Sequence, residues 1–197
     1  MLQKQSNYYT TAEYLALEEA ADYKSEYYRG EIFAMAGASA NYNRIAGNLY
    51  AILNFGLESK PCEVFSSDMK LHVKQGELYT YPDIMVVCGR TKFVKDRTDT
   101  ITNPNVIIEV LSTSTEAYDR GLKFELYRAI DTFQFYILID QSRVHLDYYH
   151  KLPDGRWVLT EFKSADASLT IESLDLEIPI ARIYRKVDWF AEERGNS

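Results

Sequence analysis

The sequence predicts a mixed α/β domain in which a β-sheet is flanked by helices. Apolar residues recur at helical spacing over residues 41–58. The nearly continuous apolar run NVIIEVLS is typical of a central strand covered on both faces. Alternating segments separated by turn residues in the C-terminal half indicate antiparallel strands. Helices and strands do not alternate regularly along the chain, which argues against a doubly wound fold.

Length and composition are those of an ordinary soluble protein. The chain has 197 residues, of which 46% are hydrophobic and 26% are charged, and can bury a substantial core. The formal net charge of −7 argues against retention of nucleic acid by a broadly basic surface, but leaves room for an enzyme with a local basic patch and a metal ion. The chain has neither an N-terminal apolar signal segment nor a membrane-spanning apolar run. We therefore expect a cytoplasmic protein without membrane contact.

The N-terminal half begins with helical patterns and continues into strands. A helix over residues 11–26 precedes a turn at Gly30 and a strand over residues 31–36. The helix over residues 41–58 follows, and Asn41 is its expected N-cap.

Two alternating segments, residues 62–74 and 76–88, are expected to form a hairpin. The two cysteines, Cys62 and Cys88, lie among apolar residues without CxxC spacing or a pair of histidines beside them. We therefore expect reduced thiols in the core and no zinc site.

The middle of the chain contains the most buried strand. A polar connection over residues 90–102 leads to NVIIEVLS, and a helix over residues 117–130 follows it. Thr113 and Glu116 have the spacing of a capping box for that helix.

The C-terminal part is predicted to be mostly β-structure. FQFYILID reads as another buried strand, and residues 143–151 and 156–163 as an antiparallel hairpin. Residues 169–197 contain short apolar pieces and a last helical turn near Trp189. Neither GxGxxG nor GxxxxGK[ST] occurs, so a nucleotide-cradling loop has no support.

Two carboxylates occupy positions where an apolar strand should not carry charge. Asp83 follows a proline and begins the apolar run in YPDIMVVCG, and Glu109 lies inside NVIIEVLS. If the two strands are neighbours, the carboxylates converge at one end of the sheet and repel unless a proton or a cation is bound. Oxygen ligands favour Mg²⁺ or Mn²⁺ over zinc.

Lys123 follows on the predicted helix, with Asp119 and Tyr127 as its i−4 and i+4 neighbours. A lysine beside a metal-bound water can orient that water and stabilise charge on a phosphate. Each residue also has an ordinary explanation: Asp83 as a turn or cap residue, Glu109 as a salt-bridge partner, and Lys123 as a solvated side chain.

Five segments together resemble the Uma2 family of restriction-endonuclease-like proteins, within the PD-(D/E)xK nuclease superfamily. They are GEIFAMAGAS (30–39), SSDMKLHV (66–73), YTYPDIMVVCG (79–89), NPNVIIEVLSTSTEAYDRGLKFELYR (103–128) and DGRWVLTEF (154–162). The resemblance covers roughly residues 10–185. It implies one domain over residues 1–197, with a restriction-endonuclease-like α/β core and an added antiparallel hairpin.

The resemblance implies roles for individual residues. Asp83 corresponds to the superfamily's metal-binding aspartate and Glu109 to its second acidic ligand, and the backbone carbonyl of Val110 completes the protein's ligands to Mg²⁺ or Mn²⁺. The superfamily's usual lysine position is occupied by Leu111. Lys123, in a D-x-x-x-K stretch, matches a lysine that has moved onto the helix.

Four further residues match family positions or depart from them. Glu31 matches a glutamate near the site and is expected to be an extra ligand or a water-positioning group. Glu26 and Asp68 also match, and structural salt bridges or turns explain them equally well. Tyr42 stands where many relatives have a histidine.

The reaction implied by the resemblance is metal-dependent hydrolysis of phosphodiester bonds in DNA. The alternative is a catalytically inactive protein that uses the fold for binding or assembly, and a third hypothesis is a nuclease acting on RNA or a branched structure. An enzyme that cuts duplex DNA would act as a homodimer to reach both strands. The three histidines are expected at the surface: His72, His145 and His150.

Overall fold

The structure is a computed structural model that describes residues 8–35 and 37–189. Its helical segments are α1 (Thr11–Ala20), α2 (Ala40–Gly56), η1 (Lys74–Gly76), α3 (Glu116–Tyr118), the π-helical η2 (Asp119–Lys123), α4 (Phe124–Tyr127), η3 (Glu172–Leu174) and α5 (Ile180–Ile183). Its strands are β1 (Ser25–Tyr28), β2 (Glu31–Ala34), β3 (Cys62–Ser66), β4 (Lys70–Val73), β5 (Leu78–Thr80), β6 (Ile84–Cys88), β7 (Thr100–Ile101), β8 (Val106–Leu111), β9 (Phe135–Asp140), β10 (Leu146–Lys151), β11 (Trp157–Phe162), β12 (Ser168–Ile171) and β13 (Leu176–Pro179).

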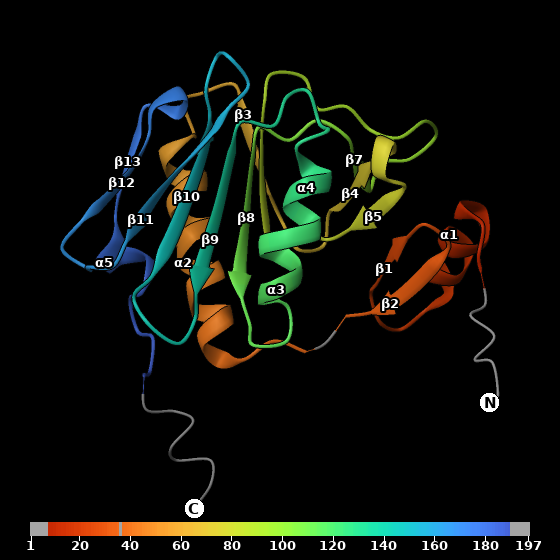
Figure 1. Ribbon diagram of the computed structural model, residues 1–197, viewed down its shortest axis with the longest axis horizontal. Helices are drawn as coiled ribbons and strands as arrows, with labels where there is room; N and C mark the ends of the chain where they lie inside the picture. The colour runs from red at the N-terminus through yellow and green to blue at the C-terminus, as the bar shows by residue number, and fades with distance from the viewer. Residues whose placement is uncertain (1–7, 36, 190–197) are drawn as a thin grey trace, which may run out of the picture.

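A six-stranded mixed sheet forms the centre of the molecule, in the order β11-β10-β9-β8-β6-β3 (Figure 1). β8 runs parallel to β9 and antiparallel to β6, and every residue of β8 is buried, as predicted for the central strand. α2 packs on one face of this sheet together with β12, β13 and α5. α4 covers the other face, so the sheet has a hydrophobic core on each side.

A second sheet, in the order β2-β1-β5-β4-β7, lies beside the first and carries α1 (Figure 1). The predicted hairpin of residues 62–74 and 76–88 divides between the two sheets, because β3 pairs with β6 whereas β4 pairs with β5. Pro82, which has no N–H to donate to a ladder, lies at the break between β5 and β6. Asp83 therefore occupies the junction between the two sheets.

The first helix is shorter than predicted. α1 ends at Ala20, and Glu26 belongs to β1 rather than to a helix. The predicted strand over residues 31–36 is confirmed as β2 up to Ala34, while Ala36 lies outside the described residues. The hairpin of β10 and β11 is confirmed.

Two predicted helix starts are wrong. Ser39, not Asn41, caps α2, because its side chain accepts the N–H of Tyr42. The capping box of Thr113 and Glu116 does not form: Thr115 precedes α3 without a side-chain cap bond, and the carbonyl of Ser112 accepts the N–H of Glu116 at 2.9 Å.

The C-terminal helix also lies earlier than predicted. α5 ends at Ile183, and Trp189 is in a turn. Residues 190–197 lie outside the described residues. Within residues 8–35 and 37–189, no helix combines the length and the apolar character needed to cross a membrane.

The prediction of two reduced thiols is wrong. Cys62 and Cys88 lie opposite each other in the β3–β6 pair and form a disulfide bond. The N–H of Cys62 donates to Lys60, and that of Cys88 to the side chain of Asn105, so the two cysteines exchange no backbone hydrogen bond. Side chains approach most closely at such positions of an antiparallel pair. The predicted hairpin already indicated that Cys62 and Cys88 lie opposite each other, because they are about equally far from its turn.

Candidate active site

Asp83 and Glu109 lie side by side at the end of two neighbouring strands. Because Ile84 pairs with Ile108, Asp83 lies opposite Glu109. The backbone N–H of Asp83 donates to Glu109 Oε2 at 3.3 Å, and the N–H of Val110 donates to Asp83 Oδ2 at 2.6 Å. The residues are only 8% and 3% exposed, respectively. The predicted convergence of the two carboxylates is therefore present in the fold.

Lys123 reaches Glu109 of this pair from the helical segment. Its Nζ lies 3.3 Å from Glu109 Oε1 and 3.1 Å from Asp119 Oδ1. The lysine is 5% exposed, so it is not the solvated side chain considered above. It ends the π-helical turn η2, and such turns frequently occur at functional sites. Tyr127, one turn further on, donates to Glu109 Oε1 at 2.9 Å.

The second sheet contributes another carboxylate. Glu26 Oε1 on β1 lies 3.1 Å from Lys123 Nζ and accepts a hydrogen bond from the hydroxyl of Thr80 on β5. Tyr42, near the start of α2, donates its hydroxyl to Asp83 Oδ1. Glu26, Glu109 and Asp119 surround Lys123, and Asp83 joins them through Glu109; we refer to these five residues as the acidic cluster.

Burial and like charges dominate the electrostatics of the acidic cluster. Burial raises the pKa of Asp83 to about 6, although the hydrogen bonds from Tyr42 and Val110 act against it. Burial, together with the charges of Asp119 and Asp83, also raises the pKa of Glu109 well above its ordinary value. Lys123 stays charged, because its carboxylate neighbours outweigh burial and raise its pKa.

The sequence indicates Asp119 and Tyr127 only as neighbours of Lys123. In the structure Asp119 belongs to the acidic cluster, and Tyr127 donates a hydrogen bond to its Glu109. Asp119 is 3% exposed, and its Oδ1 has no hydrogen-bond donor among the described residues although Lys123 is at ion-pair distance. The i−4 and i+4 spacing around Lys123 is the sequence feature that could have identified Asp119 and Tyr127 as site residues, because it places all three on one face of the helix.

Two of the family-matched residues lie outside the acidic cluster. Glu31 begins β2 with an exposed side chain, and no ion pair or hydrogen bond of the described residues connects it to the acidic cluster. Asp68 is exposed and forms an ion pair with Lys24. The ligand role of the Val110 carbonyl remains a prediction, since the contact seen here is made by its N–H.

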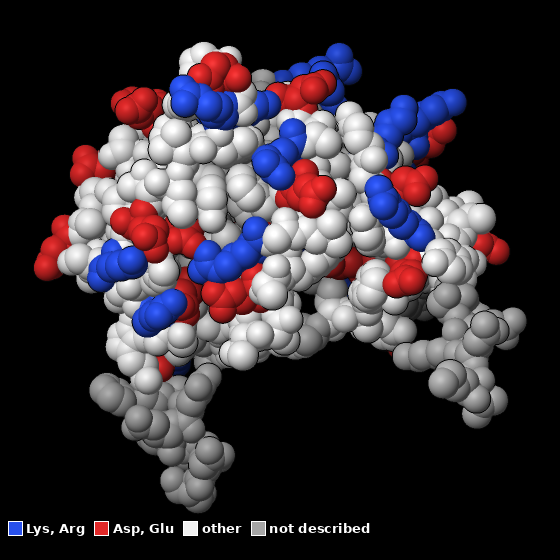
Figure 2. Space-filling model, viewed as in Figure 1, with Lys and Arg blue, Asp and Glu red and all other residues white. Residues whose placement is uncertain are grey.

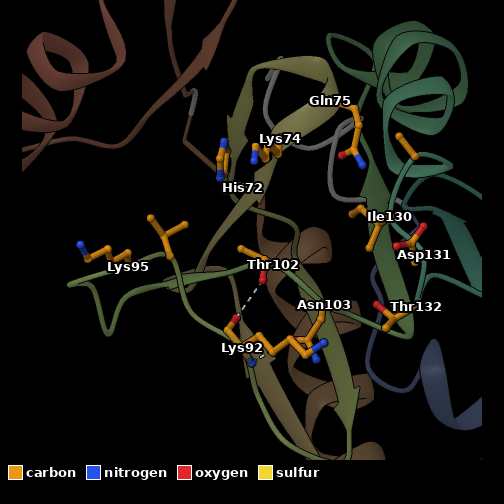
Figure 3. A pocket seen from close by; sticks show the side chains of 12 residues that line it. His72, Lys74, Gln75, Lys92, Lys95, Thr102, Asn103, Ile130, Asp131 and Thr132 are labelled. Atoms are coloured by element: carbon orange, nitrogen blue, oxygen red, sulfur yellow. Dashed lines mark hydrogen bonds between the residues drawn. The ribbon is translucent and has the colours of Figure 1, made fainter.

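A pocket lies away from the acidic cluster, at the opposite ends of the same strands. It has a volume of about 490 Å³, and Lys74, Lys92 and Lys95 are among its lining residues (Figure 3). Lys92 follows the last residue of β6, whereas Asp83 precedes its first. On the face seen in Figure 2, basic and acidic side chains are intermixed without a continuous basic surface.

The fold and the acidic cluster define a restriction-endonuclease-like α/β protein. A crystal structure described as that of "a putative nuclease belonging to DUF820" from Anabaena variabilis ATCC 29413 is similar to the chain, with a TM-score of 0.71. The similarity covers 89% of this chain and 97% of that chain at 20% sequence identity, which shows a shared fold.

The chain belongs to the Uma2 family, described as "Putative restriction endonuclease", whose model matches residues 11–181. Two relatives come from Synechocystis sp. (strain ATCC 27184 / PCC 6803 / Kazusa). Uncharacterized protein sll1609 is 44% identical over 160 residues, which are 81% of this chain and 90% of the relative. Uncharacterized protein slr1290 is 39% identical over 175 residues, which are 88% of this chain and 90% of the relative. The resemblance seen in the sequence motifs is thereby confirmed.

Proposed function

We propose that this protein is a metal-dependent endonuclease that hydrolyses phosphodiester bonds in DNA. Asp83 and Glu109 hold Mg²⁺ or Mn²⁺ with the backbone carbonyl of Val110, and Lys123 acts beside them. The observation that carries the proposal is the meeting of Asp83, Glu109 and Lys123 in one buried cluster, although they come from three separate elements.

The acidic cluster has the charge and the donor atoms for a divalent cation. Three of its four carboxylates pair with a single lysine, the fourth, Asp83, lies beside Glu109, and burial in a region of low dielectric makes the excess negative charge costly. Asp119 Oδ1 is buried and accepts no hydrogen bond among the described residues, and its ion-pair partner is Lys123, so a divalent cation bound here would share this oxygen with the lysine. All these donors are oxygens, which suits Mg²⁺ or Mn²⁺ better than zinc.

The residues of the chain hold the reacting groups in place. A bound Mg²⁺ would supply a water of lowered pKa and neutralise charge on the attacked phosphate. The N–H of Val110 and the hydroxyl of Tyr42 fix the orientation of the Asp83 carboxylate. Lys123, held by Glu109 and Glu26, places its ammonium where it can bind the nucleophilic water or a phosphate oxygen.

The proposal also specifies the nucleic-acid substrate, the domain organisation and the oligomeric state. DNA rather than RNA is proposed from the family description alone, so both must be assayed side by side. We propose one cytoplasmic domain. Glu31, whose exposed side chain has no hydrogen bond or ion pair to the acidic cluster among the described residues, is assigned no role in the reaction. We also propose a homodimer, because cutting both strands of a duplex requires two sites. Light scattering at micromolar concentration tests the dimer, and a monomeric mass would contradict it.

The decisive experiment combines metal binding and cleavage on the same samples. Mn²⁺ and Mg²⁺ are titrated by calorimetry into the wild type and into a variant with Asp83→Ala and Glu109→Ala, and plasmid nicking is followed in parallel. Loss of both binding and nicking in the double variant supports the proposal. Asp68→Ala is the matched control, because this exposed acid lies outside the acidic cluster and should change neither quantity.

The alternative function is a binding or assembly module without catalysis. Lys123 already neutralises part of the acidic cluster, which is the arrangement that a purely structural ion-pair network would also have. A wild type that binds no Mg²⁺ or Mn²⁺ at millimolar concentration and nicks no plasmid would favour this module over the enzyme.

A further inference from the structure

Three acidic residues lie in one row across strands β8 to β11, with Leu138 between the first two, and the row continues beyond the acidic cluster. Strand register aligns Glu109 with Leu138, Leu138 with Asp147, and Asp147 with Glu161. Side chains aligned in this way project from the same face of a sheet. Neighbouring strands are about 4.8 Å apart, so the backbones of Glu109 and Asp147 are separated by about 10 Å. The row therefore contains a second group of carboxylates, separate from the first.

His145 completes this second group. Its Nε2 lies 3.1 Å from Asp147 Oδ1 and 3.2 Å from Glu161 Oε1. One ligand atom from each residue lies within 4.8 Å of the others. Asp147 is 3% exposed and the His145 side chain 13% exposed, which differs from the expected surface position of this histidine. We call these three residues the histidine site.

The geometry of the histidine site suits a cation better than a hydrogen bond. Nε2 carries at most one hydrogen, which can point at Asp147 Oδ1 or at Glu161 Oε1 but not well at both. Two ligands at about 2.1 Å from a tetrahedral Zn²⁺ are about 3.4 Å apart, close to the two nitrogen–oxygen distances seen here. An imidazole with two carboxylates is a donor set for first-row transition metals rather than for Mg²⁺.

The neighbours of the histidine site orient one ligand and leave another free to move. Arg120 forms ion pairs with Glu116 and with Asp147 Oδ2, the oxygen of Asp147 that does not face His145. Such a partner outside the metal site holds a carboxylate ligand in its orientation. Lys163 Nζ lies 3.0 Å from Glu161 Oε1, and both side chains are largely exposed. Lys163 can therefore withdraw into solvent when a cation arrives.

An open pocket beside the histidine provides room for water ligands. It has a volume of about 410 Å³ and is lined by Arg143, Val144, His145 and Lys163.

We propose that His145, Asp147 and Glu161 bind a transition-metal ion, Zn²⁺ foremost, at a centre distinct from Asp83 and Glu109. The ion joins edge strand β11 to β10. Through Arg120 it stabilises the packing of this hairpin against the helical segment that carries Lys123. The site does not depend on the proposed nuclease activity, since its ligands lie outside the acidic cluster.

The test is a calorimetric titration of Zn²⁺ in the presence of saturating Mg²⁺, with the full chain in its oxidised form. The described chain has no free cysteine, so thiols do not compete for zinc. We expect one bound Zn²⁺ in the wild type and in the variant with Asp83→Asn and Glu109→Gln. His145→Gln should weaken binding at least about 100-fold. Lys163→Gln should strengthen it, because the competing ammonium is removed.

Two further variants separate ligand loss from a damaged fold. Glu161→Gln changes an exposed side chain and should weaken zinc binding while the thermal unfolding curve without metal is unchanged. His150→Gln is the matched control on the opposite face of β10 and should bind zinc like the wild type. Zinc binding that survives His145→Gln, or a wild type that binds no zinc at ten times the protein concentration, would overturn the proposal.

Discussion

Lys123 Nζ lies 3.1 Å from Glu26 Oε1, and this ion pair joins the two sheets at the acidic cluster. Glu26 belongs to β1 of the five-stranded sheet, whereas Glu109, another partner of the lysine, belongs to β8 of the six-stranded sheet. The lysine is thus a cation shared by carboxylates from both sheets and from its own helical segment. Its removal has consequences for stability as well as for activity.

Lys123→Met should destabilise the metal-free protein strongly. The substitution leaves Glu26, Glu109 and Asp119 buried without their cation, and breaking such a buried pair costs about 3–5 kcal/mol. Urea unfolding in EDTA measures the loss. Added Mg²⁺ should restore more stability to the variant than to the wild type, because the ion takes over part of the lysine's charge.

Lys92→Met provides the matched control for this substitution. Lys92 is exposed and forms no ion pair among the described residues, so its loss should change the free energy of unfolding by less than about 0.5 kcal/mol. A Lys123→Met variant as stable as this control would show that the acidic cluster is held mostly protonated rather than by the lysine.

Stability of the metal-free protein should fall as pH rises through the range in which Asp83 titrates. Its pKa is raised from 3.8 in the unfolded chain to about 6 in the fold, so the folded state binds more protons between these values. The free energy of unfolding therefore decreases from about pH 4 to about pH 6. Glu109, with a pKa also raised by burial, extends the decrease to higher pH.

Asp83→Asn should reduce that slope, because asparagine does not titrate. Urea unfolding in EDTA at several pH values compares the two proteins. The variant is expected to gain stability relative to the wild type above about pH 6 and little below about pH 4. Parallel pH profiles for the two proteins would contradict the raised pKa of Asp83.

Tyr42→Phe should weaken metal binding with little effect on the fold. The substitution removes only the hydroxyl that donates to Asp83 Oδ1, and loss of a partner that orients a metal ligand typically costs about tenfold in affinity. Calorimetry with Mn²⁺ gives the affinity. Tyr50→Phe on the same helix is the control, because that side chain is exposed. Equal affinities for the two variants would exclude an orienting role for Tyr42.

The disulfide bond should contribute measurably to stability. It closes a loop with a sequence separation of 26, and the chain-entropy model gives about 3–4 kcal/mol for that length. The variant with Cys62→Ser and Cys88→Ser should lose this amount in urea unfolding. Reductant should lower the stability of the wild type to a similar level and leave the variant unchanged. A wild type insensitive to reductant would mean that the bond is absent in solution.

Much of the fold and the central pair of the site follow from local patterns. The buried run around Glu109 predicts the central strand, and the charge of Asp83 at the start of an apolar strand marks it as unusual. The hairpin pattern correctly brings the segments of Cys62 and Cys88 together, but it does not reveal that this hairpin divides between two sheets. The prediction of reduced thiols is wrong because it used the apolar neighbours of each cysteine and not their equal distance from the hairpin turn, which places them opposite each other.

The remaining members of the site are less accessible to sequence reasoning. The sequence pattern places Glu26 at the end of a helix, because residues 21–26 contain neither glycine nor proline to end the helix after Ala20. Strand β1 forms because its residues pair with β2 and β5, which are tertiary contacts. Glu31 also matches a family position, in the segment GEIFAMAGAS, and its side chain is exposed outside the acidic cluster.

The sequence by itself determines where the central strands run and that Asp83 and Glu109 place charge within them, because both are patterns of hydrophobicity over a few residues. Only the tertiary structure decides that Lys123 is shared by carboxylates from two sheets and that His145 meets Asp147 and Glu161. Those contacts depend on the order of the strands and on their register, and a shift of one residue would send each side chain to the other face.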